Sequence, residues 1–495
     1  MKQHTIRLHP LGKEIMVNDQ TPLVDVLHEY GFEFPCGGNG TCGKCRVRLL
    51  DGNIPLTDFH RRKLDQFQLP PGWRLACMSR CTENFTLQAD QYEHLILADE
   101  SEFEFIPEPG YGVAVDLGTT TLVAQLVDLS SGKILAVETL LNPQVKFGAD
   151  LITRIQAGLN GHATEMTEMI RCAIGQMIER MLNACKLIPD KVIMVGNTVM
   201  QHIFGGLDLT PLSCYPFQVD NPVNENYSAA ELGWKFEVAK TIQCYPNIGS
   251  FVGSDILAGI AATGLHRNER YTALIDLGTN GEIVVGNRDR VICASTAAGP
   301  AFEGSVISMG MRAVTGAISS LRLIEDRIVS SVIGNVVATG ICGSALIDAV
   351  AILRKQNLIG PFGEILSGET TIQMQGSIRL TQKDLYEFLL AKAAIAAGIT
   401  LLARELSLDP TGISELYIAG GFGNYIDTEH LLLTGMVETT PDKLHKMGNT
   451  ALIGAKMFLF GNGELASEIL ARSHHVNLEE FPDFQDVFIS KMMLT

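Results

Sequence analysis

The sequence has 495 residues, of which 46% are hydrophobic and 19% are charged. This length is more than one core usually accommodates, so we expect about two to four globular domains and no extended disorder. Thirty-eight lysines and arginines stand against 55 aspartates and glutamates, and the net charge of −17 argues against nucleic acid and anionic membrane surfaces as partners. With no apolar signal core and no long uncharged apolar run, a cytoplasmic location is expected.

Cysteine usage is uneven along the chain. Five of the 11 cysteines lie between Cys36 and Cys81, and the other six are scattered over the remaining sequence. A disulfide framework would space its cysteines more evenly. The pattern therefore predicts a metal centre near the N-terminus rather than a set of structural disulfides.

The first ninety residues have the alternating pattern and the turn residues of a small β-rich domain. A linker is expected at 91–110, because this stretch is acidic and carries prolines, which keep a chain extended. The elements predicted in the first domain are strands at 5–8, 14–17, 46–50 and 85–88, a helix from Thr21-Pro22 to near Gly31, and a short helix at 58–67.

Residues 36–45 read Cys-Gly-Gly-Asn-Gly-Thr-Cys-Gly-Lys-Cys, and Cys77 follows about thirty residues later in the sequence Arg-Leu-Ala-Cys. Glycines let a backbone wrap closely round a cluster and present N–H groups to its sulfurs. A structural zinc site is the competing interpretation, although zinc usually takes two paired C-x2-C arms. Cys81 is an alternative fourth ligand to Cys77, and its simpler interpretation is a buried thiol.

This loop and the Arg-Leu-Ala-Cys segment resemble the plant and vertebrate type of [2Fe-2S] ferredoxin over residues 1–90. The spacing C-x5-C-x2-C is one residue longer than the plant-type C-x4-C-x2-C and closer to the vertebrate type. The resemblance implies a one-electron carrier whose [2Fe-2S] cluster is held by Cys36, Cys42, Cys45 and Cys77.

A repeated motif is the second strong signal. Gly-Val-Ala-Val-Asp-Leu-Gly-Thr-Thr-Thr at 112–121 is echoed by Thr-Ala-Leu-Ile-Asp-Leu-Gly-Thr-Asn-Gly-Glu at 272–282. In each copy an apolar strand ends at an aspartate, turns through Leu-Gly-Thr and resumes as a strand. Such a turn exposes N–H groups and hydroxyls to phosphate oxygens, and its aspartate is suited to Mg²⁺ or to orienting water.

A third element, Leu-Tyr-Ile-Ala-Gly-Gly-Phe-Gly-Asn at 416–424, is a strand that enters a glycine turn. Together the three elements resemble the phosphate-1, phosphate-2 and adenosine motifs of the superfamily of actin, sugar and acetate kinases and heat-shock ATPases. The resemblance implies ATP binding. It assigns phosphate contacts to Gly118, Thr119, Thr120, Thr121, Gly278, Thr279, Asn280 and Gly281, and the adenosine side to Gly420, Gly421 and Gly423.

The intervening sequence is mixed α/β, with helical periodicity at 165–185, 343–356 and 385–406 and a buried strand from Lys191. Thr381-Gln-Lys-Asp384 predicts an N-terminal cap on the last of these helices. We therefore expect an α/β and α+β protein, in which an N-terminal β-grasp ferredoxin-like domain (1–90) precedes a two-lobed actin/sugar-kinase-like ATPase domain of duplicated ribonuclease-H-like fold. Its lobes are expected at about 111–265 and 266–495.

Four further stretches, at 245–255, 297–304, 310–313 and 340–344, are similar to the ATP-dependent reductive activators of corrinoid proteins. This resemblance extends over 112–495. It implies ATP-coupled one-electron reduction of a corrinoid protein of a methyltransferase or O-demethylase system from Co(II) to Co(I). It also implies a low-potential ferredoxin or reductase as electron donor, and a homodimer is possible.

Three carboxylates are candidates for catalysis. Asp116 and Asp276 are expected to position Mg²⁺ and water, and Glu303 to orient the attacking water, although an ordinary loop carboxylate is an equal interpretation. Cys342 is interpreted as a packed thiol, and the pair His474-His475 as surface residues.

Two other functions fit the motifs. A kinase of a small hydroxyl or carboxyl substrate with a fused redox domain would use the same phosphate turns. An ATP-driven electron donor to a non-corrinoid enzyme would use both sites, as do the activators of 2-hydroxyacyl-CoA dehydratases, which resemble this chain in their ATPase turns but share a [4Fe-4S] cluster across a dimer.

Overall fold

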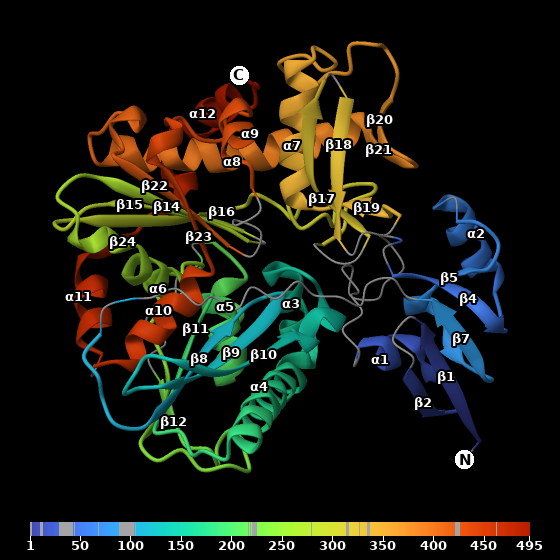
Figure 1. The fold of residues 1–495 in the computed structure, drawn as a ribbon, viewed down its shortest axis with the longest axis horizontal. Coiled ribbons are helices and arrows are strands. Elements are labelled where there is room, and N and C mark those ends of the chain that lie inside the picture. The colour runs from blue at the N-terminus through green and yellow to red at the C-terminus, as the bar shows by residue number, and fades with distance from the viewer. Residues whose placement is uncertain are drawn as a thin grey trace.

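Figure 1 shows the computed structural model, in which a small N-terminal domain lies beside two larger α/β lobes. The described residues are 2–9, 13–28, 43, 45–67, 69–88, 103, 105–215, 217, 219, 225–278, 280–312, 316–325, 327–333, 337–420, 426–461 and 463–495. Of the predicted site residues, Cys36, Cys42, Thr279, Gly421 and Gly423 lie outside this set.

The N-terminal domain is a five-stranded sheet in the order β2-β1-β7-β4-β5, around a core that includes Leu23, Val47 and Leu87. The predicted strands and the second helix are confirmed, but Thr21-Pro22 is wrong as a helix start, because it pairs with Arg80–Cys81 as a short strand. The elements are β1 (Gln3–His9), β2 (Lys13–Asn18), β3 (Thr21–Pro22), α1 (Leu23–His28), β4 (Arg46–Gly52), α2 (Asp58–Gln66), β5 (Trp73–Leu75), η1 (Ala76–Met78), β6 (Arg80–Cys81) and β7 (Phe85–Gln88).

The first lobe is built on a six-stranded sheet in the order β10-β9-β8-β11-β13-β12. Strands β8, β9 and β10 form an antiparallel meander, and β11 and β13 add in parallel beside β8. The elements are β8 (Tyr111–Leu117), β9 (Thr121–Asp128), β10 (Ile134–Leu141), η2 (Pro143–Phe147), α3 (Leu151–Ala157), η3 (Gly158–His162), α4 (Ala163–Cys185), β11 (Lys191–Gly196), α5 (Thr198–Gly205), η4 (Thr210–Leu212), β12 (Glu225–Tyr227), β13 (Thr241–Cys244), α6 (Ser254–Thr263) and η5 (Leu265–Arg267).

The second lobe repeats this topology in a sheet of order β23-β22-β14-β15-β16-β24. Its meander is β14-β15-β16, and β22 and β23 add in parallel beside β14. The sheet elements are β14 (Thr272–Leu277), β15 (Gly281–Gly286), β16 (Val291–Thr296), β22 (Glu415–Ala419), β23 (Leu444–Gly448) and β24 (Ser473–His475). Five strands have the same order in both lobes, and the sixth adds at opposite edges, as β12 beside β13 and as β24 beside β16. The shared order accounts for the sequence repeat, since each copy is the turn between the first two strands of a meander.

The second lobe also carries a three-stranded insertion, β18-β17-β19, and a hairpin, β20-β21. The predicted cap of the long helix is confirmed: Thr381 accepts from the backbone N–H of Asp384, and the Asp384 carboxylate accepts from that of Thr381. The remaining elements are β17 (Ala317–Ile324), β18 (Arg327–Val332), β19 (Gly340–Ile341), α7 (Gly343–Lys355), β20 (Thr371–Gln375), β21 (Ile378–Thr381), α8 (Gln382–Glu405), η7 (Pro410–Gly412), α9 (Thr428–Leu433), η9 (Pro441–Lys443), α10 (Thr450–Leu459), α11 (Glu464–Arg472), η10 (Leu478–Glu480) and α12 (Phe484–Lys491).

Helices α6 and α10 lie between the two sheets and share a core with both, which includes Ala114 of β8 and Leu274 of β14. Their approach is close: a Cβ added at Gly454 of α10 would lie 2.1 Å from the carbonyl oxygen of Ala258 in α6. The helix pair therefore joins the lobes at their base. Helix α8 is long and apolar enough to cross a membrane by length and composition, but 83% of its most apolar window is buried inside the protein, as in the core helix of a globular fold.

The end of the predicted linker packs on the ATPase domain. The ring of Phe105 lies 4.4 Å from that of Phe460, and Glu108 pairs with Lys191 at 2.7 Å and accepts from the backbone N–H of Gly461. These contacts anchor the chain just before β8, so the start of the first lobe has a fixed position.

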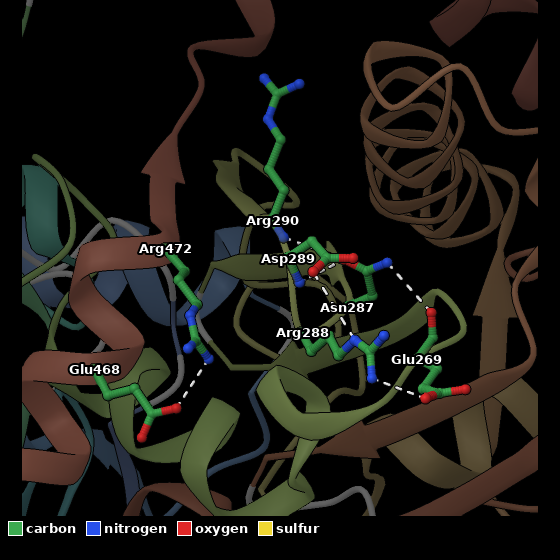
Figure 2. A network of polar contacts seen from close by, with 7 residues as sticks. All are labelled: Glu269, Asn287, Arg288, Asp289, Arg290, Glu468 and Arg472. Atoms are coloured by element: carbon green, nitrogen blue, oxygen red, sulfur yellow. Dashed lines mark hydrogen bonds and ion pairs between the residues drawn. The ribbon is translucent and has the colours of Figure 1, made fainter.

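Figure 2 shows a polar network at the end of the second-lobe sheet remote from the repeat turn. The side chain of Asn287 accepts from the backbone N–H groups of Asp289 and Arg290 and closes the β15–β16 turn, while Arg288 pairs with Glu269 at 2.8 Å. Exposed pairs of this kind contribute little to stability. The network has the geometry of a structural turn, at the opposite end of β15 from the phosphate motif.

A buried ion pair ties α9 to α7 and predicts a pH effect. His430 Nδ1 lies 2.8 Å from Asp348 Oδ1, and the other oxygen of Asp348 accepts from the backbone N–H of Leu321. The bond to Asp348 raises the pKa of His430 above its ordinary value of 6.5. Because the raised pKa belongs to the folded state, this pair stabilises fully below pH 6.5 and is lost as the pH rises through the folded value.

We therefore expect the melting temperature of the parent protein to fall between pH 6.5 and 8.5 more steeply than that of His430→Gln, which keeps a hydrogen-bonding side chain without titrating. Thermal unfolding across that range measures the difference. Equal slopes for the two proteins would contradict the assignment.

Candidate functional site

Two of the four predicted cluster ligands lie together in the structure. Cys45 Sγ and Cys77 Sγ are 3.1 Å apart, and neither thiol is in a disulfide. The antiparallel pairing of β4 with β5 brings the two cysteines together. Arg46, which follows Cys45, lies opposite Leu75, and the backbone N–H of Ala76, which precedes Cys77, donates to the carbonyl of Cys45. Two neighbouring thiols of this kind are suited to become ligands of the same metal ion.

Cys81 has a different environment. It is fully buried in the N-terminal core, and burial raises the pKa of its thiol to about 12. A metal ligand must be a thiolate, so this site disfavours the form that would bind. The geometry favours Cys77 as the fourth ligand and supports the interpretation of Cys81 as a packed thiol.

Gly43, inside the predicted cluster loop, has φ +67°, and a Cβ there would lie 2.8 Å from the ring of Phe67. Only glycine adopts this conformation without strain, and only glycine leaves space for the aromatic ring. The end of the cluster loop is thus held against α2 and the residue that follows it.

The first phosphate turn, between β8 and β9, is held by Asn142. The Asn142 amide donates to the carbonyl of Gly118 at 2.9 Å, and its backbone N–H donates to the carbonyl of Thr120 at 2.8 Å. Asn142 also caps η2 through Gln144. The turn therefore keeps its shape through one buried side chain.

Four carboxylates lie close together where the two lobes meet, a region called the crevice below: Asp116 near the end of β8, Asp276 near the end of β14, Asp255 at the start of α6 and Glu282 opposite Asp276 on β15. Burial raises the pKa of Asp116 to about 6. The pKa of Asp276 is raised to about 7, mainly by burial and in addition by the charge of Asp116. The pKa values of Asp255 and Glu282 are also raised, by burial first and then by the other carboxylates. Such crowding is relieved by a cation.

The adenosine element meets these carboxylates directly. Gly420 ends β22 with φ +101°, and a Cβ there would lie 2.3 Å from the carbonyl oxygen of Leu277 and 2.9 Å from Asp276 Oδ1. Next to it, Asn449 at the start of α10 donates to Asp116 Oδ2 at 2.9 Å. Three elements distant in sequence therefore converge on one crevice, as the three motifs predict.

Glu303 does not stand alone in its loop. The hydroxyl of Thr120 donates to Glu303 Oε1 at 3.3 Å, and Arg312 Nη2 donates to the same hydroxyl at 3.1 Å. Since Thr120 belongs to the first lobe and both partners to the second, these contacts bridge the crevice. Glu303 therefore lies beside the first phosphate turn, and its role in orienting water stays a prediction.

Other predicted residues have simpler places. Cys342 is buried before α7, and its sulfur lies 3.2 Å from the hydroxyl of Ser344, as expected of a packed thiol. His474 is exposed on β24, but its neighbour His475 packs against Gly249 and is only partly exposed. The surface interpretation is correct for the first histidine and only partly correct for the second.

Sequence reasoning missed Asp255, Glu282, Asn142, Asn449 and Arg312 as site residues. Glu282 carried a usable signal, because it follows the second Leu-Gly-Thr turn at the position that faces the motif aspartate across a hairpin. The other residues come from remote segments, and only the folded arrangement brings them to the crevice.

Comparison with known proteins follows the same division. A family model of the 2Fe-2S iron-sulfur cluster binding domain matches residues 6–82, one of the RACo middle region matches 111–268, and one of the C-terminal ASKHA domain of RACo matches 270–495. The corrinoid activation enzyme RamQ of Eubacterium limosum is 32% identical over 453 residues, which cover 83% of this chain and 76% of RamQ. The chain belongs to the RACo family.

Two further relatives also match this RACo-family chain over most of its length. A solved structure of a reductive activator for corrinoid, iron-sulfur protein superposes with a TM-score of 0.69 at 26% identity and covers 99% of this chain and 98% of its own. The [Co(II) methylated amine-specific corrinoid protein] reductase of Methanosarcina barkeri is 26% identical over 72% of this chain and 71% of its own length. The predicted fold class is confirmed. The chain carries a 2Fe-2S cluster binding domain and a nucleotide-binding ASKHA domain.

Proposed function

We propose that the protein uses ATP to drive the one-electron reduction of a corrinoid protein from Co(II) to Co(I). The observation that carries this proposal is that the likeness to the solved reductive activator spans 99% of the chain, so that it includes both the cluster domain and the ATPase lobes. RamQ and the Methanosarcina barkeri reductase are both named for the same kind of substrate.

Cys45 and Cys77, together with Cys36 and Cys42 of the same motif, would hold the [2Fe-2S] cluster. The adjacent thiols and the glycine conformation at Gly43 fit such a group. A bound cluster of this type supplies one-electron transfer at about −400 mV. For each 59 mV by which the acceptor has a more negative potential than the cluster, the equilibrium constant for electron transfer falls about tenfold. Reduction of Co(II) therefore requires an added source of free energy.

The crevice residues fit Mg²⁺ and a nucleotide as that source. Asp116 and Asp276 lie under the two phosphate turns; burial raises the pKa of both carboxyl groups, and the charge of Asp116 adds to the rise at Asp276. No group of three or more His, Cys, Asp or Glu side chains encloses a metal position within the described part of the chain. Mg²⁺ does not need one, since it usually takes one or two carboxylates and completes its shell with water and phosphate oxygens.

A structural path leads from the crevice to the cluster domain. Asn142 holds the first phosphate turn and caps η2, and η2 lies against α1, the helix that precedes the cluster motif. A nucleotide that reshapes the turn would shift the position of η2 and, through it, the contact with α1. We infer that nucleotide state alters the placement of the cluster domain relative to the corrinoid partner.

The remaining partners are proposed on the same basis. A low-potential ferredoxin or reductase would supply the electron, the acidic chain would act in the cytoplasm, and a homodimer would be compatible with the fold. The kinase alternative has no observation in its favour beyond the phosphate turns.

The test follows the Co(I) absorption band of a corrinoid methyl-carrier protein in anaerobic solution with a low-potential donor and catalytic amounts of this protein. We expect Co(I) to accumulate with ATP and not with a non-hydrolysable analogue. Absence of Co(I) with every corrinoid carrier tried, together with ATP-dependent phosphorylation of a small molecule, would replace this proposal with the kinase function.

A further inference from the structure

Arg154 of α3 is fully buried. Its Nε donates to the carbonyl of Gly148 at 3.1 Å, and its Nη1 lies 3.4 Å from Gln144 Oε1 and 3.2 Å from the sulfur of Met200. Among the described residues, Nη2 has no hydrogen-bond partner. A buried guanidinium is usually fully bonded, so an Nη2 group without a partner requires an explanation.

The charge of Arg154 is likewise incompletely matched. In the part of the chain that the structure describes, Arg154 forms no ion pair, and burial of an unpaired cation is costly. Burial and then the positive charge of Arg312 lower the pKa of Arg154 to about 9, opposed by Asp150 and Glu303. The group therefore stays protonated at neutral pH, and Asp150 is already committed to capping α3 through Thr153.

Arg312 extends this positive region to the first phosphate turn, where its Nη2 donates to the hydroxyl of Thr120 at 3.1 Å. Arg154 of the first lobe and Arg312 of the second are close enough for their positive charges to interact, and Glu303, which accepts from the hydroxyl of Thr120, is one of the carboxylates that act on Arg154. An oxyanion beside Arg154 would supply the negative charge that this buried guanidinium lacks.

We propose that Arg154 and Arg312 form a subsite for a phosphate oxyanion beside the first phosphate turn. Guanidinium groups bind phosphate oxygens with planar, charge-assisted hydrogen bonds, and the open Nη2 of Arg154 is suited to such an oxygen. The oxyanion is either the terminal phosphoryl group of the nucleotide or the inorganic phosphate left after hydrolysis. The subsite rests on the proposed nucleotide binding in the adjacent crevice.

The subsite would also carry the effect of phosphate towards the cluster domain. Arg154 holds Gly148 and Gln144, which lie at the end of η2 and within it, and η2 lies against α1. Loss of the oxyanion would leave the buried charge of Arg154 unmatched beside the positive charge of Arg312. Phosphate release is therefore the step at which this region is expected to loosen.

The test uses the full-length protein with its cluster, the variants Arg154→Met and Arg312→Gln, and the control Arg180→Gln, whose guanidinium forms an exposed pair with Glu138 in the same lobe. Titration calorimetry measures the affinities for ATP and ADP. Thermal unfolding in saturating ADP measures stabilisation by added inorganic phosphate. We chose methionine at Arg154 because a buried cation is often replaced by an apolar side chain of similar volume without loss of stability.

We expect the parent and the control either to bind ATP more tightly than ADP or to be stabilised by added phosphate. In each variant, the corresponding affinity, for ATP relative to ADP or for phosphate, should fall at least about tenfold. Loss of ATP preference assigns the subsite to the bound terminal phosphoryl group, and loss of the phosphate response assigns it to the released ion. If Arg154→Met does not fold, Arg312→Gln decides the matter.

Parent-like ATP preference and phosphate response in a folded variant would overturn the subsite. So would a parent protein that binds ADP and shows neither effect, and the proposed ATPase function would then stand. A parent protein that binds neither ATP nor ADP would instead contradict the proposed function itself.

Discussion

The Cys77→Ala variant should lose the visible [2Fe-2S] absorption and the bound iron, whereas Cys81→Ala should keep both. Cys77 Sγ lies 3.1 Å from Cys45 Sγ at the cluster end of the domain, while Cys81 is buried in the core with its thiol pKa raised to about 12. Removal of a ligand leaves three thiolates for a cluster that requires four. Absorption and iron content of anaerobically purified protein measure the effect.

Cys81→Ala is the matched control, because it also removes a thiol but one that packs against apolar neighbours. We expect Cys81→Ala to lower the stability of the fold only modestly, since the change leaves a small cavity. Calorimetry should show that Cys77→Ala binds ATP with the parent affinity, because the nucleotide crevice is built from other elements. Retention of the cluster in Cys77→Ala and its loss in Cys81→Ala would reverse the assignment of the fourth ligand.

The cluster motif was accessible from sequence because most of its chemistry is local. Three of the four thiols lie within residues 36–45, where spacing alone indicates the ligand set. The fourth ligand was less certain, since the choice between Cys77 and Cys81 depends on how β5 pairs with β4. That pairing is a tertiary contact, and it places Cys77 rather than Cys81 beside Cys45.

The nucleotide crevice was only half predictable for the same reason. Asp116 and Asp276 sit in repeated turns and were found by self-similarity, but Asn449, which binds Asp116, lies 333 residues away from it. Asp255 was seen only within a family-like stretch, and its contact with the two motif carboxylates comes from the placement of α6 between the sheets. No local pattern encodes that placement.

Arg154 is the extreme case. In sequence it occupies a position in an ordinary short helix, Leu-Ile-Thr-Arg-Ile-Gln-Ala, where an arginine is expected to face solvent. Its complete burial follows from the way η2 and α5 close over it, and this could not be deduced before the fold was known. Its proximity to Arg312 of the other lobe depends on the arrangement of both lobes.

The Asp276→Asn variant should lose ATP hydrolysis by roughly 100-fold or more while keeping the [2Fe-2S] spectrum. Asp276 lies under the second phosphate turn, 2.9 Å from the position that a Cβ on Gly420 would take, and faces Asp116 across the crevice. Asparagine keeps the shape of the side chain but neither balances the charge of Mg²⁺ nor holds water as a carboxylate does. Steady-state phosphate release measures the effect.

The same substitution should raise the stability of the nucleotide-free protein, which separates a functional role from a structural one. Burial and the charge of Asp116 raise the pKa of Asp276 to about 7, so its ionised form is unfavourable in the folded state and stability is lost as the pH rises through that value. Removing the charge should increase the melting temperature at pH 8 by about 1–3 °C. Asp442→Asn is the control, because Asp442 is exposed and its pKa is lowered by Thr440. A destabilised Asp276→Asn protein with parent ATPase activity would show that the carboxylate supports the fold and not the chemistry.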